Sequence, residues 1–273
     1  MMRRGLLLVA LLLALPYIAL PVATESFDHG YADYAQLLAR YVQGSGVAYA
    51  ALKADRGALD RVTAQFDAPA AREAGWTREQ RMAFWINAYN AFTLRAIVDA
   101  YPIQSRWFTR QPRNSIRQIG GVWTTPRWRG AGRSVSLDDI EHQVLRPGFK
   151  DARIHFAVNC ASISCPPLAA EPYRADSLDA QLDAAARRYL ASQEGLRLDG
   201  NTLRVSGIFK WYGEDFVAEY SPIVPGTRPP VERAILGVIV RFGPPDAAVR
   251  AQNGEPGIAF LDYDWALNET EPR

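Results

Sequence analysis

The stretch TREQRMAFWINAYNAFTLRAIV, residues 77–98, decides the fold of this chain. Its first residue, Thr77, can accept a hydrogen bond at the start of a helix while Gln80 reaches back, which is the capping-box pattern. Apolar residues then occupy every face of the predicted helix, whereas a surface helix keeps one face polar. We therefore expect the central buried helix of the domain here, with its polar members Asn87 and Asn90 in need of hydrogen-bond partners.

Helical and extended patterns continue on both sides of this helix. Further helices are expected at residues 31–42, 59–66, 177–192 and 231–240, strands at 153–159 and 258–265, and a hairpin at 196–205. A short helix should begin at a second capping pattern, Ser136 with Asp139, and end at Pro147. Long helices with short, scattered strands indicate an α+β fold, a helix-rich single domain around a small, mainly antiparallel sheet.

The first residues have the order of a secretory signal: two arginines, an apolar run over residues 6–23, and a break by prolines. We expect residues 1–24 to be a signal peptide or, because the run lacks a clean small-x-small cleavage site, an uncleaved membrane anchor. Residues 25–273 then form a single globular domain, exported to the periplasm or the extracellular space. Membrane contact is expected only through the N-terminal segment, since no later apolar run is long enough to span a bilayer.

The formal net charge of +2 favours no class of partner, but the charges are unevenly distributed. Residues 104–135 hold seven arginines, several aromatic residues and no acidic residue. They are Arg106, Trp107, Phe108, Arg110, Arg113, Arg117, Trp123, Arg127, Trp128, Arg129 and Arg133. Such a segment suits phosphate or carboxylate groups, although its charges can also pair with carboxylates elsewhere in the fold, which we favour. Nucleic acid is not an expected partner of an exported protein.

The chain has only two cysteines, Cys160 and Cys165, on a segment that two prolines bend. A bend at this spacing can bring the two α-carbons within the ~4.4–6.8 Å of a disulfide, and an oxidising compartment favours pairing. We expect a structural disulfide, with a redox-active pair, a catalytic thiol and metal ligation as alternatives. Because the spacing is that of neither thioredoxin-type motifs nor zinc knuckles, no metal site or cofactor is predicted.

A thiol enzyme would need a base near the sulfur and a third group to orient that base. The candidates are Cys160 as nucleophile, His142 or His155 as base, and Glu141 or Asn87 as the orienting group. His142 lies beside Glu141 on the short capped helix, and His155 lies on the predicted strand 153–159. Each histidine is also readily explained as a hydrogen-bonded structural residue, which we favour.

Two further polar pairs could bind a ligand or stabilise the fold. Asn87 and Asn90 are three residues apart and lie on one face of the central helix. They could bond to backbone groups, which we favour, or line a cleft that holds a ligand. Lys210 and Asp215 could form an ion pair with either a structural or a binding role, and again we favour the structural one.

Several blocks of the sequence together resemble the family known as domain of unknown function 547. The blocks are FWINAYN (84–90), SLDDIEH (136–142) with LR (145–146), HFAVNC (155–160) with SCP (164–166), KWY (210–212) with DF (215–216), and YDWALN (263–268). The resemblance spans residues 76–268 and implies kinship without an established reaction. Some relatives join this domain to glutaredoxin-like or leucine-zipper regions, which suggests thiol chemistry or scaffolding by association only. The site positions that it implies are Asn87, Asn90, Glu141, His142, His155, Cys160, Cys165, Lys210 and Asp215.

The sequence therefore predicts an exported α+β domain with a cleft between the central helix and residues 155–165. The cleft is expected to bind a small anionic ligand or a peptide beside a Cys160–Cys165 disulfide. One alternative is a thiol-dependent enzyme, either a hydrolase or transferase or a thiol–disulfide redox enzyme. The other alternative is a scaffolding module without a site.

Overall fold

The computed structural model describes residues 27–67, 73–105, 109–125 and 127–270. The expected signal peptide or anchor, residues 1–24, lies outside the described residues, as do Arg106, Trp107 and Phe108 of the arginine-rich segment. Across the described ranges, no helix combines the length and the apolar character that crossing a bilayer requires.

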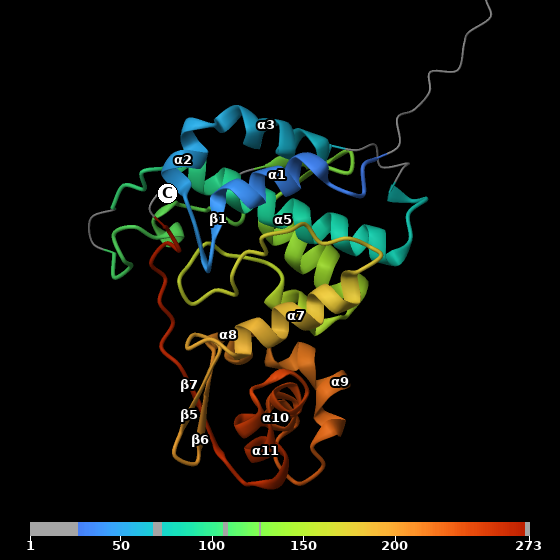
Figure 1. Cartoon of the computed structure of the whole chain (residues 1–273), viewed down its shortest axis with the longest axis vertical. Coiled ribbons are helices and arrows are strands. Elements are labelled where there is room, and N and C mark those ends of the chain that lie inside the picture. The colour runs from blue at the N-terminus through green and yellow to red at the C-terminus, as the bar shows by residue number, and fades with distance from the viewer. Residues whose placement is uncertain (1–26, 68–72, 106–108, 126, 271–273) are drawn as a thin grey trace, which may run out of the picture.

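The predicted central helix is confirmed as α5 (Arg78–Ala100). Its capping box is formed, because the side chain of Thr77 accepts from the backbone of Gln80 while the Gln80 side chain accepts from the backbone of Thr77. Nearly all side chains from Met82 to Val98 are buried. Figure 1 shows α5 running beneath α1 (Ala32–Tyr41), α2 (Tyr49–Ala54) and α3 (Arg56–Gln65). This half of the molecule surrounds a first hydrophobic core that includes most of α5.

The other half of the molecule surrounds a second hydrophobic core. Its helices are α7 (Leu178–Leu190), α8 (Gly207–Tyr212), α9 (Val217–Tyr220), α10 (Pro230–Phe242) and α11 (Pro245–Asn253), with the 3-10 turns η4 (Gly213–Phe216) and η5 (Ser221–Ile223). In Figure 1 these helices lie below α5, with α7 between the two halves. The helices predicted at 31–42, 59–66, 177–192 and 231–240 are confirmed as α1, α3, α7 and α10.

The strands of the described residues form three small sheets, which together with the helices confirm the α+β class. Two are antiparallel hairpins, β1 (Val42–Gln43) with β2 (Gly46–Val47) and β3 (Trp128–Gly130) with β4 (Arg133–Val135). In the third, β5 (Leu196–Asp199) pairs antiparallel with β6 (Thr202–Val205), which confirms the predicted hairpin, and β6 pairs parallel with β7 (Gly257–Phe260). The last strand therefore ends five residues earlier than the predicted 258–265.

The strand predicted at 153–159 is wrong. Residues Ala152–Phe156 form the 3-10 helix η3, and the carboxylate of Asp151 caps it by accepting from the backbone of Arg153. Ile154 belongs to the first hydrophobic core and Phe156 to the second. In a strand these two side chains would point to the same face. The 3-10 helix points them in different directions, so each side chain can pack into its own core.

The helix predicted from Ser136 to Pro147 is capped as expected but longer. Ser136 and Asp139 satisfy one another's backbone N–H groups. The helix then widens into a π-helical segment, η2 (Asp139–Leu145), and continues as α6 (Arg146–Phe149) through Pro147. In the π-helical turn the backbone N–H of Arg146 donates to the carbonyl of Glu141. π-helical turns of this kind occur frequently at functional sites.

After β7 the chain runs back along the molecule as an extended segment, residues 261–270, which we call the C-terminal strap (Figure 1). The backbone of Ile163 donates to the carbonyl of Ala266 at 2.8 Å, and that of Asn268 donates to Ala161 at 3.3 Å. The strap also reaches β2, where Val47 donates to the carbonyl of Asn268 at 2.8 Å. It therefore ties the second half of the molecule to the first.

Candidate functional site

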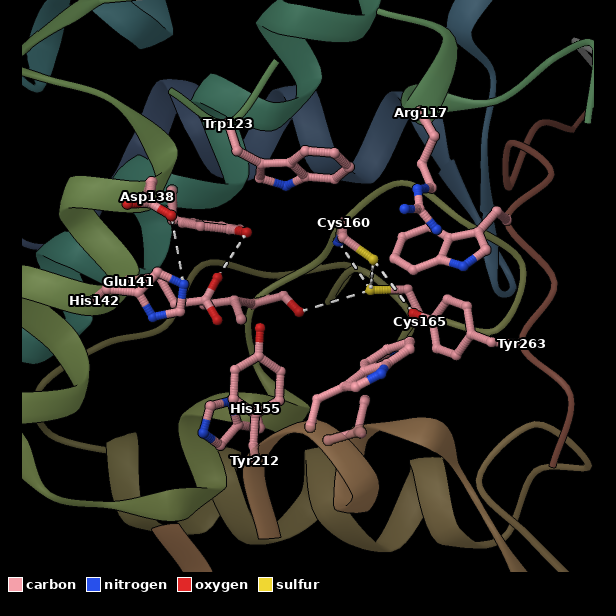
Figure 2. A pocket seen from close by; sticks show the side chains of 16 residues that line it. Arg117, Trp123, Asp138, Glu141, His142, His155, Cys160, Cys165, Tyr212 and Tyr263 are labelled. Atoms are coloured by element: carbon pink, nitrogen blue, oxygen red, sulfur yellow. Dashed lines mark hydrogen bonds and ion pairs between the residues drawn. The ribbon is translucent and has the colours of Figure 1, made fainter. Parts of the chain in front are cut away.

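A cavity of about 430 Å³ opens where η2, the cysteine loop (residues 160–165), α8 and the C-terminal strap meet (Figure 2). Its walls are mainly aromatic and are formed by Tyr89, Trp123, Trp211, Tyr212, Tyr263 and Trp265. Its polar lining consists of Arg117, Asp138, Glu141, His142, His155, Cys160 and Cys165. The volume is in the range of small-molecule sites, which combine apolar walls with a few polar groups.

The two cysteines lie side by side in the wall of this pocket (Figure 2). Both are free, with their Sγ atoms 2.7 Å apart, whereas a disulfide bond measures about 2.05 Å. The expected disulfide is therefore not formed in this structure. The backbone N–H of Cys160 donates to the Cys165 sulfur at 2.8 Å, so the loop holds the two sulfurs together.

The environments of the two sulfurs are unequal. A hydrogen bond with Cys165, helped by the hydroxyls of Ser162 and Tyr263, lowers the pKa of the Cys160 thiol despite its burial. Those hydroxyl oxygens lie 3.3 Å and 3.4 Å from the Cys160 sulfur. Burial and the neighbouring Cys160 raise the pKa of Cys165 well above its usual value. Cys160 is thus the more acidic thiol of the pair and Cys165 the less acidic one, and this asymmetry is typical of an attacking and a resolving cysteine.

The backbone of the cysteine loop is strained and firmly held. Ala161 has a φ of 57°, in the left-handed region that non-glycine residues seldom adopt. The side-chain oxygen of Asn159 accepts from the backbone of Ala161 at 2.9 Å, and its amide donates to the carbonyl of Pro166 at 2.8 Å. Asn159 is itself fixed by Asn90, whose side-chain oxygen accepts from its backbone at 2.8 Å. The central helix therefore positions the cysteines through Asn90.

Neither predicted asparagine lines the pocket. The amide of Asn90 also donates to the carbonyl of Ala157 at 3.0 Å. Asn87 bonds to both backbone groups of Tyr173, at 2.8 Å and 2.9 Å. Both residues thus have the backbone-tying contacts that the sequence favoured over ligand binding.

One end of the pocket is acidic. Glu141 is only 7% exposed and accepts a hydrogen bond from the hydroxyl of Tyr89 at 3.1 Å. The charge of this carboxylate also raises the pKa of Tyr212, after the larger effect of burial. Burial raises the pKa of both tyrosines, which therefore remain protonated donors. Among the residues that the structure describes, no basic side chain forms an ion pair with Glu141.

The two predicted histidines line the pocket but do not contact either sulfur. His155 bonds through Nε2 to Asp215 at 2.7 Å and stacks on Tyr212 with ring centroids 4.1 Å apart. Arg146 donates to Nδ1 of His142 at 3.0 Å, so that ring carries its proton on Nε2, which lies 3.6 Å from Asp138. Both rings are held by groups other than the thiols.

Asp215 joins three helical segments. Arg146 binds it through two nitrogens, at 2.6 Å and 2.9 Å, in addition to the bond from His155. Burial raises the pKa of Asp215, but the hydrogen bonds and charges of His155 and Arg146 outweigh burial and hold that pKa well below its usual range. Lys210 is exposed on α8 and is not the partner of Asp215, so the predicted Lys210–Asp215 pair is wrong.

Three of the six described arginines of residues 104–135 form ion pairs with carboxylates of other segments. Arg127 pairs with Asp139, Arg129 with Asp67 at 3.3 Å, and Arg133 with Glu73 at 3.2 Å. Arg117 differs, because it lines the pocket with its guanidinium over the ring of Trp265, 4.7 Å from the centroid. Only Arg117 of this segment therefore contributes charge to the pocket among the described residues.

Chemical reasoning from the sequence missed several residues of the site. Arg146, Tyr212 and Tyr263 stand inside the sequence blocks of the family resemblance, which was the one signal that could have found them. Tyrosines are common in cores, so their roles as donors to a carboxylate and a sulfur become visible only from the contacts. Within the described ranges, no group of three or more histidine, cysteine or acidic residues could hold a metal ion.

Comparison with known proteins gives one match. Residues 74–190 match the model of a family described as "Protein of unknown function, DUF547". None of the curated proteins and none of the solved structures matches the chain. The matched residues include Glu141, His142, His155 and both cysteines, but they end before α8 and the C-terminal strap. Through residues 74–190, this chain carries a domain of the DUF547 family.

Proposed function

We propose that the protein is a thiol–disulfide exchange enzyme in which Cys160 attacks and Cys165 resolves. The observation that carries this proposal is the unequal cysteine pair at the wall of the pocket. The sulfurs are 2.7 Å apart, and the pKa is lowered at Cys160 and raised at Cys165. The thiolate is the nucleophile in such reactions, and a second thiol within reach completes the exchange.

The reaction has two balanced steps. The Cys160 thiolate attacks one sulfur of a substrate disulfide, forms a mixed disulfide with it, and releases the other half of the substrate as a thiolate. Cys165 then transfers its proton to a departing thiolate and attacks the Cys160 sulfur, which releases the second half. The substrate gains two electrons, and the protein is left with a Cys160–Cys165 disulfide. The reverse sequence oxidises a dithiol substrate.

Hydrolase or transferase chemistry has less support. A thiol hydrolase needs a general base at the sulfur, but the partners of the Cys160 sulfur are Cys165, Ser162 and Tyr263. The backbone N–H of Cys160, a natural oxyanion donor, is used by the Cys165 sulfur. Thiol–disulfide exchange needs neither group, because its leaving group is a thiolate.

The second candidate function is ligand binding in a pocket beside a purely structural disulfide. The burial of Cys165, which is 6% exposed, favours it. The two candidates differ in how easily the pair is reduced. A structural disulfide typically has a potential below about −300 mV, whereas catalytic pairs lie higher. We expect the Cys160–Cys165 pair to equilibrate with glutathione buffers, and a pair that stays oxidised in them would support the structural candidate.

Trapping of the mixed disulfide tests the mechanism directly. The reduced wild-type protein, Cys165→Ser and Cys160→Ser are each mixed with hydroxyethyl disulfide and analysed by mass spectrometry. We expect Cys165→Ser to retain one hydroxyethylthio group, the wild type to lose two hydrogens and retain none, and Cys160→Ser to react slowest. A wild-type protein that accumulates the mixed disulfide, or a Cys160→Ser variant as fast as the wild type, would contradict the proposal.

A further inference from the structure

The charges of the pocket suggest what kind of disulfide it accepts, an inference that rests on the proposed exchange function. Glu141 is more than nine-tenths buried and faces the pocket with a hydrogen bond from Tyr89 but no ion-pair partner among the described residues. A buried charge is normally compensated by an opposite one. Asp138 lines the same end, and its contact is His142 at 3.6 Å. This end of the pocket therefore favours a cationic group of the ligand.

The other end carries a positive charge. Arg117 lines the pocket, and its guanidinium lies over Trp265, which holds it in place through a cation–π contact. No carboxylate of the described residues forms an ion pair with Arg117. A guanidinium fixed in this way can bind a carboxylate through two parallel hydrogen bonds.

The sulfurs lie between the two charged ends. Figure 2 shows Glu141 and Asp138 on one side, Arg117 on the other, and Cys160 with Cys165 between them. Trp123 and Tyr263 provide aromatic surface near the sulfurs (Figure 2), and Trp265 also lines the pocket. Sulfur of a ligand makes favourable contacts with aromatic rings. The order along the pocket is therefore cation site, sulfur site, anion site.

We propose that the substrate is the disulfide or thiol of a cysteine-like amino acid or short peptide, with its ammonium group at Glu141 and a carboxylate at Arg117. The negative charge of Glu141 raises the pKa of Cys160. A ligand ammonium group beside Glu141 neutralises this charge and so favours the Cys160 thiolate. Binding of the correct substrate would thus strengthen the nucleophile as well as position it.

A panel of disulfides that differ only in end groups tests this proposal. Oxidation of the reduced wild-type protein is followed with cystine (ammonium and carboxylate), cystamine (ammonium only), dithiodipropionate (carboxylate only) and hydroxyethyl disulfide (neutral). We expect cystine to be fastest by roughly ten- to hundredfold over the neutral probe, because hydrogen bonds to charged groups contribute roughly 1.5–3 kcal/mol each. Cystamine and dithiodipropionate should fall between them.

Two variants test which end of the pocket binds the ammonium group and which binds the carboxylate. Glu141→Gln keeps an acceptor oxygen for the Tyr89 hydroxyl and should slow cystine and cystamine but not dithiodipropionate. Arg117→Gln should slow cystine and dithiodipropionate but not cystamine. Arg113→Gln, an exposed arginine four residues away that does not line the pocket, is the matched control and should behave as the wild type.

The outcomes separate the substrate class from the function. If all four probes oxidise the pair at similar rates, the zwitterionic class is wrong while the exchange mechanism stands. If no probe oxidises the pair, the exchange function itself fails. Binding of S-methylcysteine, a zwitterionic thioether that cannot exchange, is then measured by calorimetry. Binding that Glu141→Gln and Arg117→Gln both weaken would support the ligand class independently, and no binding would overturn it.

Discussion

The reactivity of Cys160 depends on a few hydrogen bonds to one sulfur. Cys165, Ser162 and Tyr263 all lie within hydrogen-bond distance of it, and a hydrogen bond donated to the sulfur stabilises the thiolate more than the thiol. Because only the thiolate reacts with an alkylating agent, the pH midpoint of alkylation reports the pKa of Cys160. The effect of removing each donor can therefore be measured in the folded protein.

We expect Tyr263→Phe and Ser162→Ala each to raise the alkylation midpoint of Cys160, by on the order of one pH unit or less, since one hydrogen bond contributes about 1 kcal/mol and one unit corresponds to about 1.4 kcal/mol. Iodoacetamide labelling from pH 5 to 10, in the Cys165→Ser background and in the wild type, provides the measurement. Tyr41→Phe, whose hydroxyl bonds to Asp55 away from the pocket, is the control. A midpoint unchanged in both variants would mean that these hydroxyls do not tune the sulfur.

At the scale of single residues, the sequence located the cysteine pair but not its partners. Two cysteines on one bent segment had to lie close together, and they do. The histidine bases were a natural hypothesis because His142 and His155 are the only histidines near the site, and both do line the pocket. Their rings are held by Arg146 and Asp215 instead of a sulfur, and such side-chain choices depend on tertiary distances that spacing along a chain does not give.

At the scale of helices and strands, the carboxylate of Asp215 connects helical segments beside the pocket. Asp215 on η4 binds Arg146 at the start of α6 and His155 on η3. Its pKa in the folded protein lies below that of an unfolded chain. A depressed carboxyl pKa contributes stability at pH values above the unfolded pKa of about 3.9, and this contribution is lost as the pH falls toward the folded pKa.

Asp215→Asn should therefore destabilise the protein by roughly 1–3 kcal/mol at pH 7, with a smaller difference from the wild type at pH 3. Urea unfolding of both proteins at the two pH values measures this. Glu214→Gln, an exposed neighbour on the same turn, is the control for a lost negative charge and should change the free energy of unfolding little at either pH. A difference of equal size at pH 3 and pH 7 would exclude the ion pair as its origin.

The helices and strands also show where local sequence patterns are sufficient to predict the structure. The capping boxes at Thr77 and Ser136 predicted two helix starts correctly, because capping is decided by residues three apart. The stretch 153–159 was predicted wrongly as a strand, because Ile154 and Phe156 pack into different cores. The π-helical turn before Pro147 was also missed, since proline ordinarily ends a helix. Both errors lie beside the pocket, where packing between the two halves outweighs local preference.

The pocket is a property of the whole molecule. The family match ends at residue 190, yet Trp211, Tyr212, Tyr263 and Trp265 complete the cavity. The C-terminal strap brings the last two of these to the cysteine loop through backbone hydrogen bonds. The matched segment therefore carries the cysteines and Glu141, whereas the residues that enclose them come from α8 and the strap.

The compartment of the protein determines which oxidation state of the cysteine pair prevails. An exported protein meets oxidising conditions, in which the pair would rest as a disulfide and act as an oxidant of thiols, whereas reducing cytosol would keep it as a dithiol. The N-terminal segment, with two arginines before the apolar run 6–23, predicts export. On this prediction of export, we propose that the exchange reaction runs toward the oxidation of thiols.

We expect a fusion of the full chain to alkaline phosphatase, which is active only after export, to show activity in a bacterial host. Replacing Leu12 and Leu13 by arginine should abolish that activity, because charges inside the apolar run prevent insertion, whereas Arg3→Lys should retain it. Alkylation of the thiols in intact cells should then find the Cys160–Cys165 pair mainly oxidised with the natural segment and reduced with the double arginine variant. Equal activity of the two fusion proteins would contradict export, and a reduced pair in the exported protein would mean that the enzyme works as a reductant there.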